Sequence, residues 1–423
     1  MEMKPEKMLK RAVAFFKQEG VVRTGCRIFT EPICALLEPL IKKCYIDRGK
    51  VNQNLVGFYS RPTFSDNGEV FYHYLLERPE YQRMKFIWFL DDERGQMPDG
   101  ERTKTVQLKS RFHHGYTYAA RRQMRQCGFL FSTHVLYAER IPGQRIVYLW
   151  HGCSYKKADE TFLAKHLCAD ALLVPGPLFV RTKSESWRIP AEILLPLGYP
   201  RYDLLNQDSQ KAEKFARKIG KGNRLVIWLP TFRNPADKRS KLPELALENT
   251  GELPLIHGEQ QLRWLDHCCE ELGITLCIKR HHYQSVWAHE EETLSNIRFL
   301  KDEDFFREGV ALYSFLRYTD ALITDYSSVA VDYLLLDRPI AFTLDDLQVY
   351  QKYRGLVFDD PENYMPGDHL YLPENLKSYL ENISLGKDEH AKDRQRMKEI
   401  MHNPCDHYCA RIAERCIDSF LRA

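Results

Sequence analysis

The chain has 423 residues and a formal net charge of +3, and 44% of its residues are hydrophobic. This composition excludes wholesale disorder, and the nearly balanced charge gives no indication of nucleic-acid binding. The length exceeds the size at which a single core keeps growing, so two domains are expected.

Residues 1–50 form a segment in which basic side chains such as Lys7 and Arg11 alternate with apolar ones such as Phe15 and Phe16. No apolar stretch reaches the roughly 18 residues that a bilayer span needs. A basic amphipathic helix of this kind is typical of a segment that lies on anionic lipid, and a helical lid packed on the body is an equal alternative.

Residues 51–205 alternate short apolar strands with helices, which predicts a Rossmann-like domain with a mostly parallel sheet. Strands are expected at 54–60, 85–90, 105–110, 129–133, 145–152, 170–176 and 192–198, with helices at 72–77, 118–126 and 178–187. A polar stretch near residue 205 then indicates a connection between two units.

Residues 206–423 repeat the pattern and predict a second Rossmann-like domain that ends in helices. Its expected strands are 224–232, 274–281, 296–300, 321–325 and 339–344, with a helix at 260–272. Ligands of such sheets bind beyond the carboxyl ends of the strands, in a cleft.

The strand at 321–325 leads into a predicted helix at 327–337 that Ser327 and Ser328 begin. A helix start directs N–H groups and a positive dipole at one point, so this turn is a candidate diphosphate cradle. Asp325 would repel a diphosphate unless it orients a donor, so a structural role in the turn is at least as well supported. Asp332, two helical turns further on, faces either the cleft or the solvent.

The twelve cysteines lie mostly inside apolar runs and no secretory signal peptide is present, so a reduced, cytoplasmic protein is expected. Cys405 and Cys409 with nearby histidines could suggest zinc. However, Cys405, Cys409 and Cys416 fit one face of a terminal helix, which favours a core helix over a metal site.

Polar clusters follow several of the predicted strands, and any one of them alone is a weak signal. They are Trp150-His151-Gly152 with Lys156, the 198–203 segment with Arg201, the 230–233 segment with Thr231 and Arg233, the 279–282 segment with Lys279 and His281, and Thr324 to Ser328. Five such clusters at strand ends, in two α/β units, are a stronger signal of function than any one of them.

From Leu55 to the C-terminus the chain resembles the CDP-glycerol glycerophosphotransferases, which build teichoic-acid and related capsule polymers. The motifs that carry the resemblance are Ser65-Asp66-Asn67, WHGxxxK at 150–156, GxPRxD at 198–203, PTFR at 230–233, KxH at 279–281 and, most specific, ITDYSSxxxDYxxLxxP at 323–339, followed by Asp346-Leu347, Tyr350, Arg354-Gly355 and Pro366-Gly367.

The resemblance implies a GT-B-like fold in which two Rossmann-type domains face a cleft. It implies attack of an acceptor hydroxyl on the β-phosphorus of CDP-glycerol with release of CMP. His151 is then the base and His281 the contact to the diphosphate or departing CMP. Substrate-binding residues would be Lys156, Arg201, Thr231, Arg233, Lys279, Thr324, Asp325, Ser327, Ser328 and Asp332, with Asp66, Asn67 and Gly152 on the acceptor side.

The chain departs from the family pattern where two prolines are absent. Cys153-Ser154-Tyr155 occupies the first position and His282 the second. Losing a proline frees the backbone, so the loops that hold both histidines could differ and favour another polyol or acceptor. No carboxylate cluster or DxD element stands out, so neither an obligatory metal nor a cofactor is expected.

These features predict a peripheral enzyme at the cytoplasmic face of the plasma membrane that transfers glycerol phosphate to a lipid-linked or polymeric acceptor. A donor such as CDP-ribitol is the closest alternative. A nucleotide-sugar glycosyltransferase would instead release a nucleoside diphosphate, and a non-catalytic nucleotide-binding protein would show no turnover. No nucleic-acid partner is expected, and a single catalytic unit leans towards a primase.

Overall fold

The computed structural model describes residues 21–47, 49–91, 100–110, 115–136, 138–157, 166–231, 253–279 and 294–422, with the side chains described from residue 30 onward. The chain divides into two compact units. Unit 1 comprises Met1–His151, His166–Leu172 and Glu414–Ala423, and unit 2 comprises Gly152–Lys165 and Leu173–Ala413. The chain thus leaves unit 1 after His151, re-enters it for His166–Leu172, and returns to it again at Glu414.

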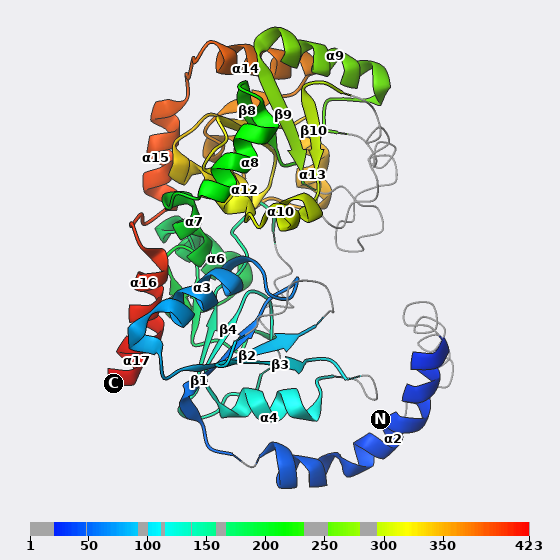
Figure 1. Ribbon diagram of the computed structural model, residues 1–423, viewed down its shortest axis with the longest axis vertical. Coiled ribbons are helices and arrows are strands. Elements are labelled where there is room, and N and C mark those ends of the chain that lie inside the picture. The colour runs from blue at the N-terminus through cyan, green and yellow to red at the C-terminus, as the bar shows by residue number, and fades with distance from the viewer. Residues whose placement is uncertain are drawn as a thin grey trace. The chain divides into compact units, whose positions relative to one another are not determined.

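Unit 1 is built on a parallel sheet whose strands follow the order β3-β2-β1-β4-β5-β6 (Figure 1). Its elements are α2 (Val21–Ile41), η1 (Lys42–Ile46), β1 (Asn52–Tyr59), α3 (Asp66–Glu77), η2 (Pro79–Tyr81), β2 (Lys85–Leu90), β3 (Thr103–Gln107), α4 (Tyr118–Gln126), β4 (Cys127–Ser132), β5 (Arg145–Tyr148), β6 (Ala171–Leu173), η8 (Glu414–Asp418) and α17 (Ser419–Arg422).

An aromatic core joins α3 to the sheet of unit 1. The Phe58 ring of β1 stacks on Trp88 of β2 at 5.2 Å and on Phe131 of β4 at 5.5 Å between centroids. From α3, Phe71 and Tyr72 meet the Phe58 ring edge-on. All five rings are buried, so their removal from water contributes strongly to holding α3 on this face.

The segment after Ala413 completes unit 1. Cys416 and Ile417 are fully buried, and the Phe420 ring packs edge-on against Phe129 of β4 at 5.6 Å. The Tyr81 hydroxyl also donates to the Asp418 carboxylate at 3.0 Å. Residues more than 280 positions apart in the sequence therefore share one core.

Unit 2 contains a second all-parallel sheet, in the order β10-β9-β8-β11-β12-β13. Its elements are α6 (Pro177–Trp187), η3 (Ala191–Ile193), β7 (Leu194–Leu195), η4 (Pro200–Tyr202), α7 (Asp203–Asn206), α8 (Gln210–Gly220), β8 (Arg224–Trp228), α9 (Gly258–Leu272), β9 (Ile274–Lys279), β10 (Ile297–Leu300), α10 (Asp302–Glu308), α11 (Leu312–Leu316), β11 (Ala321–Thr324), α12 (Ser328–Tyr333), η6 (Leu334–Leu336), β12 (Ile340–Thr343), α13 (Leu347–Tyr353), η7 (Pro361–Tyr364), β13 (Asp368–Leu370), α14 (Pro373–Ser384), α15 (Ala391–Met401) and α16 (Tyr408–Ala413).

Helices α9 and α14 lie side by side on the sheet of unit 2 (Figure 1). Leu265 of α9 and Leu376 and Leu380 of α14 are fully buried in one cluster with strand residues such as Val226 and Leu276. The strands read as continuous apolar runs because helices cover a parallel sheet.

The predicted strands and helices are largely confirmed, but the expected boundary near residue 205 differs from the observed division. That position lies inside unit 2, which begins again at Leu173. The carboxylate of Asp203 accepts hydrogen bonds from the backbone N–H groups of Tyr408 at 2.6 Å and Cys409 at 2.9 Å. This buried contact ties the segment around α7 to α16, and local composition does not reveal it.

In the part of residues 1–50 that the structure describes, the chain forms α2 and η1, and the amphipathic, surface-binding character of the whole segment stays a prediction. Ile33, Leu36, Leu37 and Leu40 are 42% to 80% exposed, and their spacing places them on one face of α2. Over the described ranges, no helix combines the length and apolar character needed to cross a membrane. The exposed apolar face of α2 will be called the α2 stripe.

Candidate active site

His151 lies just beyond the carboxyl end of β5, where Trp150 adopts a positive φ of 56° and turns the chain. The His151 side chain is exposed. Its Nδ1 atom is 2.8 Å from the carbonyl oxygen of Thr133, at the end of the neighbouring strand β4. Because a carbonyl can only accept, Nδ1 carries the proton and donates it, which makes Nε2 the basic nitrogen of the neutral ring.

Two aromatic neighbours fix the plane of the His151 ring. The His134 ring stacks on it at 4.4 Å with an interplanar angle of 9°, and the Trp150 ring lies at 4.5 Å. His134 is itself held through Nδ1, which is 2.9 Å from the Thr133 hydroxyl. The imidazole of His151 is therefore oriented from two sides and set in one tautomer, as a general base requires.

The start of α3 supports this turn from below. Asn67 is fully buried, and its side-chain amide donates to the carbonyl oxygen of Trp150 at 2.9 Å. Asp66 precedes it with a positive φ of 57°. Burial, followed by the charge of Asp66, raises the pKa of the nearby Glu69 to about 7. Asn67, which was expected on the acceptor side, acts in this structure as a positioning residue for the Trp150-His151 turn.

Gly152 directly follows His151 in the sequence and begins unit 2. Its φ is +119°, and a Cβ atom there would lie 2.6 Å from Ser328 Oγ and 2.9 Å from Arg201 Nη2. Only glycine tolerates both the conformation and the contact. The structure thus brings together three residues that the sequence analysis selected separately.

Asp332 is the centre of a buried network in unit 2. Its Oδ2 atom accepts from Arg201 Nη2 at 2.6 Å, and the side chains of Asp332 and Arg201 are 0% and 5% exposed. The Tyr202 hydroxyl donates to Oδ1 and the Tyr313 hydroxyl to Oδ2. Asp332 therefore faces neither cleft nor solvent, and it holds Arg201 in place.

The turn after β11 has the predicted strand-to-helix geometry. Ser327 is the residue before α12, with an extended backbone, and Ser328 is the first helical residue. Both serines are partly exposed. Helix α12 is short and continues as η6. The Ser328 hydroxyl lies beside Gly152, which leaves the serine pair at the edge of the buried Arg201–Asp332 network.

Asp325 and Thr324 face inward at the same turn. The Asp325 carboxylate accepts from the backbone N–H of Thr231 at 2.8 Å and from the Thr231 hydroxyl, and Asp325 is fully buried. The Thr324 hydroxyl donates to the Leu229 carbonyl at 2.8 Å. These contacts join the end of β11 to the chain beyond β8, which is the structural role considered for Asp325.

The loop that lacks the first family proline is held by side chains instead. Cys153 is fully buried, and its sulfur accepts from the Tyr199 hydroxyl at 3.2 Å. The Tyr155 hydroxyl donates to the Tyr364 carbonyl at 2.8 Å. Lys156 is partly exposed and forms an isolated β-bridge with Leu356. The missing constraint on φ is thus replaced by packing within unit 2.

The basic residues expected around the nucleotide are only partly described. Lys279, at the end of β9, forms an ion pair with Asp302 at 2.7 Å, and its side chain is 11% exposed. Arg233 and His281 lie outside the described residues.

The family model of CDP-Glycerol:Poly(glycerophosphate) glycerophosphotransferase matches residues 43–419. The chain belongs to this family. It is thus a member of the teichoic acid polyol-phosphate transferases, as the resemblance in sequence motifs predicted.

Relatives in this family include primases for two different polyols. The chain is 25% identical over 297 residues to the teichoic acid ribitol-phosphate primase of Bacillus spizizenii, covering 64% of this chain and 68% of that protein. It is 30% identical over 209 residues to the teichoic acid glycerol-phosphate primase of Bacillus subtilis, covering 49% of this chain and 48% of that protein. The match thus spans about half the length of the second relative.

The wall teichoic acid polymerase TagF shares the fold of this family member. Its structure superposes with a TM-score of 0.68 at 18% identity, over 100% of this chain and 99% of that chain. A TagF variant soaked with CDPG superposes with a TM-score of 0.67 at 17% identity, over the same shares. The expected GT-B-like α/β fold is therefore confirmed.

Sequence reasoning missed His134, the residue that stacks on the candidate base of this glycerophosphotransferase family member. A signal was present, because His134 follows the apolar run of β4 just as His151 follows that of β5. Their contact depends on β4 and β5 being neighbours in the sheet, which the sequence alone does not state.

Proposed function

We propose that this protein transfers a polyol phosphate, glycerol phosphate first, from its CDP derivative to a hydroxyl of a lipid-linked or polymeric acceptor. The observation that carries the proposal is the hydrogen bond from His151 Nδ1 to the Thr133 carbonyl, because it makes Nε2 the basic nitrogen at an exposed position. The family match and the name of the soaked TagF structure support CDP-glycerol as the donor.

In the proposed reaction, Nε2 of His151 takes the proton from the acceptor hydroxyl as its oxygen attacks the β-phosphorus. A new P–O bond forms while the bond to the CMP oxygen breaks, and CMP leaves with the bonding electron pair. Phosphoryl transfer of this kind depends mainly on positioning and on donors for the spreading negative charge.

Unit 2 would bind the diphosphate of the donor. Ser327 and Ser328 bring hydroxyls and the N–H groups at the start of α12 to the turn where Gly152 allows close approach. Arg201, held by Asp332, places guanidinium N–H donors next to Ser328. By family motif we assign to His281 a contact with the diphosphate or with the departing CMP.

We expect this charge neutralisation to need neither a metal nor a cofactor. EDTA should then leave the rate unchanged. Loss of activity in EDTA that added Mg²⁺ restores would refute this part of the proposal.

We further propose that the protein works at the cytoplasmic face of the plasma membrane. The α2 stripe is apolar and exposed, and Lys42 and Lys43 follow it directly. An apolar face with neighbouring basic residues binds anionic lipid surfaces. The wild type should sediment with phosphatidylglycerol vesicles, and a Leu36→Glu, Leu40→Glu variant should not. A wild type that fails to sediment, like the variant, would contradict this location.

CDP-ribitol is the second candidate donor, and the similarity to a ribitol-phosphate primase favours its inclusion. The two donors share the CMP leaving group, so CMP release alone does not separate them. Rates measured with each donor in turn do.

The decisive experiment is CMP release from CDP-glycerol and from CDP-ribitol, with and without a lipid-linked disaccharide acceptor. His151→Ala should lower acceptor-dependent release about 10²- to 10⁴-fold, the usual contribution of a general base. His407→Ala, which removes another exposed histidine, is the matched control and should retain the rate. Full activity in His151→Ala would eliminate the assigned base, and release of UDP or GDP from a nucleotide sugar would eliminate the reaction.

A further inference from the structure

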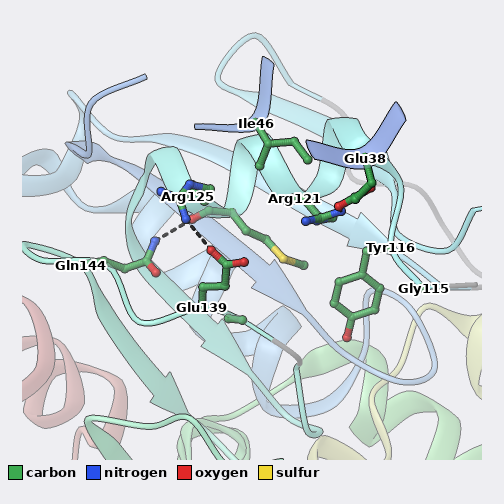
Figure 2. Close-up of a pocket in the computed structure, with 10 residues that line it drawn as sticks. Glu38, Ile46, Gly115, Tyr116, Arg121, Arg125, Glu139 and Gln144 are labelled. Carbon is green, nitrogen blue, oxygen red and sulfur yellow. Dashed lines mark hydrogen bonds and ion pairs between the residues drawn. The ribbon is translucent and has the colours of Figure 1, made fainter. Parts of the chain in front are cut away.

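A cavity of about 360 Å³ lies in unit 1 between α2, α4 and the loop before β5 (Figure 2). This volume falls within the range of roughly 300–1,000 Å³ that small-molecule sites span. Its lining includes Glu38, Tyr116, Arg121, Arg125, Glu139 and Gln144. None of these residues belongs to the candidate active site.

Most of the cavity lining lies at the edge of the sheet opposite His151, whereas Gly115 and Tyr116 follow the carboxyl end of β3. Ile46 precedes β1, Arg125 precedes β4, and Gln144 directly precedes β5. Because these strands are parallel, their beginnings share one edge, whereas His151 follows the end of β5. A molecule bound at the Arg125 and Gln144 end of the cavity is therefore held at the edge of the sheet opposite His151.

The charges of the lining cancel. Arg121 is paired with Glu38, and Arg125 Nη1 lies 2.5 Å from Glu139 Oε2, as Figure 2 shows. The carboxylates would repel a bound phosphate and the guanidinium groups would repel a bound cation, so neither ion would gain much binding energy. Hydroxyl groups both donate and accept, and they can use the donors and acceptors of such a lining together.

The remaining lining suits a ring with one apolar face. Figure 2 shows the Tyr116 ring and the Gln144 amide at opposite ends of the cavity. Gln144 is held by donation from Nε2 to the carbonyl oxygens of Met124 and Cys127, at 2.5 and 2.7 Å. Ile46 and Met124 add apolar surface. An aromatic ring, an amide and paired charges are together suited to a sugar.

Helix α2 connects this cavity to the α2 stripe. Glu38 lines the cavity, and at helical spacing it points away from the face that carries Leu36, Leu37 and Leu40. The same helix thus offers a polar side to the cavity and an apolar side to its surroundings. This arrangement matches a ligand with a polar head and an apolar tail.

We propose that the cavity binds the uncharged sugar head group of a membrane glycolipid, as an anchoring site separate from the acceptor site. This inference rests on one part of the proposed function, namely that the protein works at a membrane surface. It adds a second lipid chemistry, because the α2 stripe with its lysines recognises anionic lipid and the cavity recognises a neutral polyhydroxy head.

The test uses the full chain and vesicles of phosphatidylcholine, with or without monoglucosyl diacylglycerol. Glycolipid should increase the sedimented fraction of the wild type, and octyl glucoside below its micellar concentration should compete. Tyr116→Ala should weaken the glycolipid-dependent binding about tenfold, since an aromatic contact is worth on the order of 1 kcal/mol. Tyr371→Ala, which removes an exposed tyrosine of unit 2, is the matched control and should bind as wild type.

A second variant, Ala138→Phe, fills the cavity and leaves both ion pairs in place, so it should also abolish the glycolipid-dependent fraction. Equal binding to both vesicle types would overturn the inference, as would glycolipid binding that survives both cavity variants. An equal loss of binding to phosphatidylglycerol vesicles in Tyr116→Ala would overturn the assignment to sugar. CMP release and phosphatidylglycerol binding by the wild type test the proposed function independently, so the two can fail separately.

Discussion

Replacing Asp332 by alanine should destabilise unit 2 more than any surface substitution. The carboxylate accepts from Arg201, Tyr202 and Tyr313 and is fully buried. Its removal leaves the Arg201 guanidinium, 5% exposed, without its counter-charge. Breaking a buried pair in this way typically costs about 3–5 kcal/mol, because a charge then stays in a medium that solvates it poorly.

For a domain of this size, 1 kcal/mol shifts the Tm by about 2–4 °C, so a fall of roughly 6–20 °C is expected. Calorimetry of the purified protein measures this, and urea unfolding gives the free energy directly. Because Arg201 lies beside Ser328, the affinity for CDP-glycerol should fall as well.

Asp208→Ala provides the matched control within unit 2. It also breaks an Arg–Asp pair, between Arg317 and Asp208 at 2.7 Å, but there the carboxylate is 85% exposed. A surface pair contributes about 0–1 kcal/mol, so its loss should shift the Tm by a few degrees at most. Equal shifts in the two variants would refute the reasoning that burial decides the cost.

Three further predictions concern other residues of the two units. Gly152→Ala should weaken CDP-glycerol binding about tenfold or more in calorimetric titration, because the added Cβ would meet Ser328 and Arg201. Gly222→Ala is the control and should bind normally, since Gly222 also has a positive φ but no atom within 4 Å of the added Cβ. Equal affinities of the two variants would argue against a steric clash at Gly152. Asn67→Ala should lower the free energy of unfolding of unit 1 by about 1–3 kcal/mol in urea, because the Trp150 carbonyl loses its amide donor. It should also reduce the rate of CMP release. An unchanged rate would show that the Trp150-His151 turn tolerates the loss of this hydrogen bond. Burial lowers the pKa of His402 to about 4, so the unfolded chain takes up the proton first as the pH falls. Unit 2 should keep its full stability above pH 6.5 and lose about 3 kcal/mol between about pH 6.5 and 4. His402→Gln should remove this pH dependence of stability, and a dependence that persists would point to another group.

The sequence predicts the strands well because each is a short apolar run between polar turns, as in the β2 and β9 segments. The sequence overestimates the length of β5, which is expected to continue to residue 152. The strand ends at Tyr148, because the positive φ of Trp150 turns the chain. The predicted helix at 327–337 likewise divides into α12 and η6 and stops at Asp337, which is left-handed.

The candidate site shows a clearer limit of sequence reasoning. Motif and position were enough to select His151, Ser328, Gly152 and Arg201. The part played by Asp332 depends on Tyr202, 130 positions away, and on Tyr313 in another helix, so no local pattern could show that it is buried. Its distant partners decide whether this carboxylate can meet solvent.

The return of the chain to unit 1 after Ala413 has a consequence for biosynthesis. Cys416, Ile417 and Phe420 fill the core beneath a sheet whose first strand starts at Asn52. During translation, the apolar surface of that sheet would stay exposed until all of unit 2 has been synthesised. Exposed apolar surface binds chaperones and promotes aggregation. Expression tags or truncations placed after Ala413 should therefore change the yield of soluble protein more than equivalent changes ahead of β1.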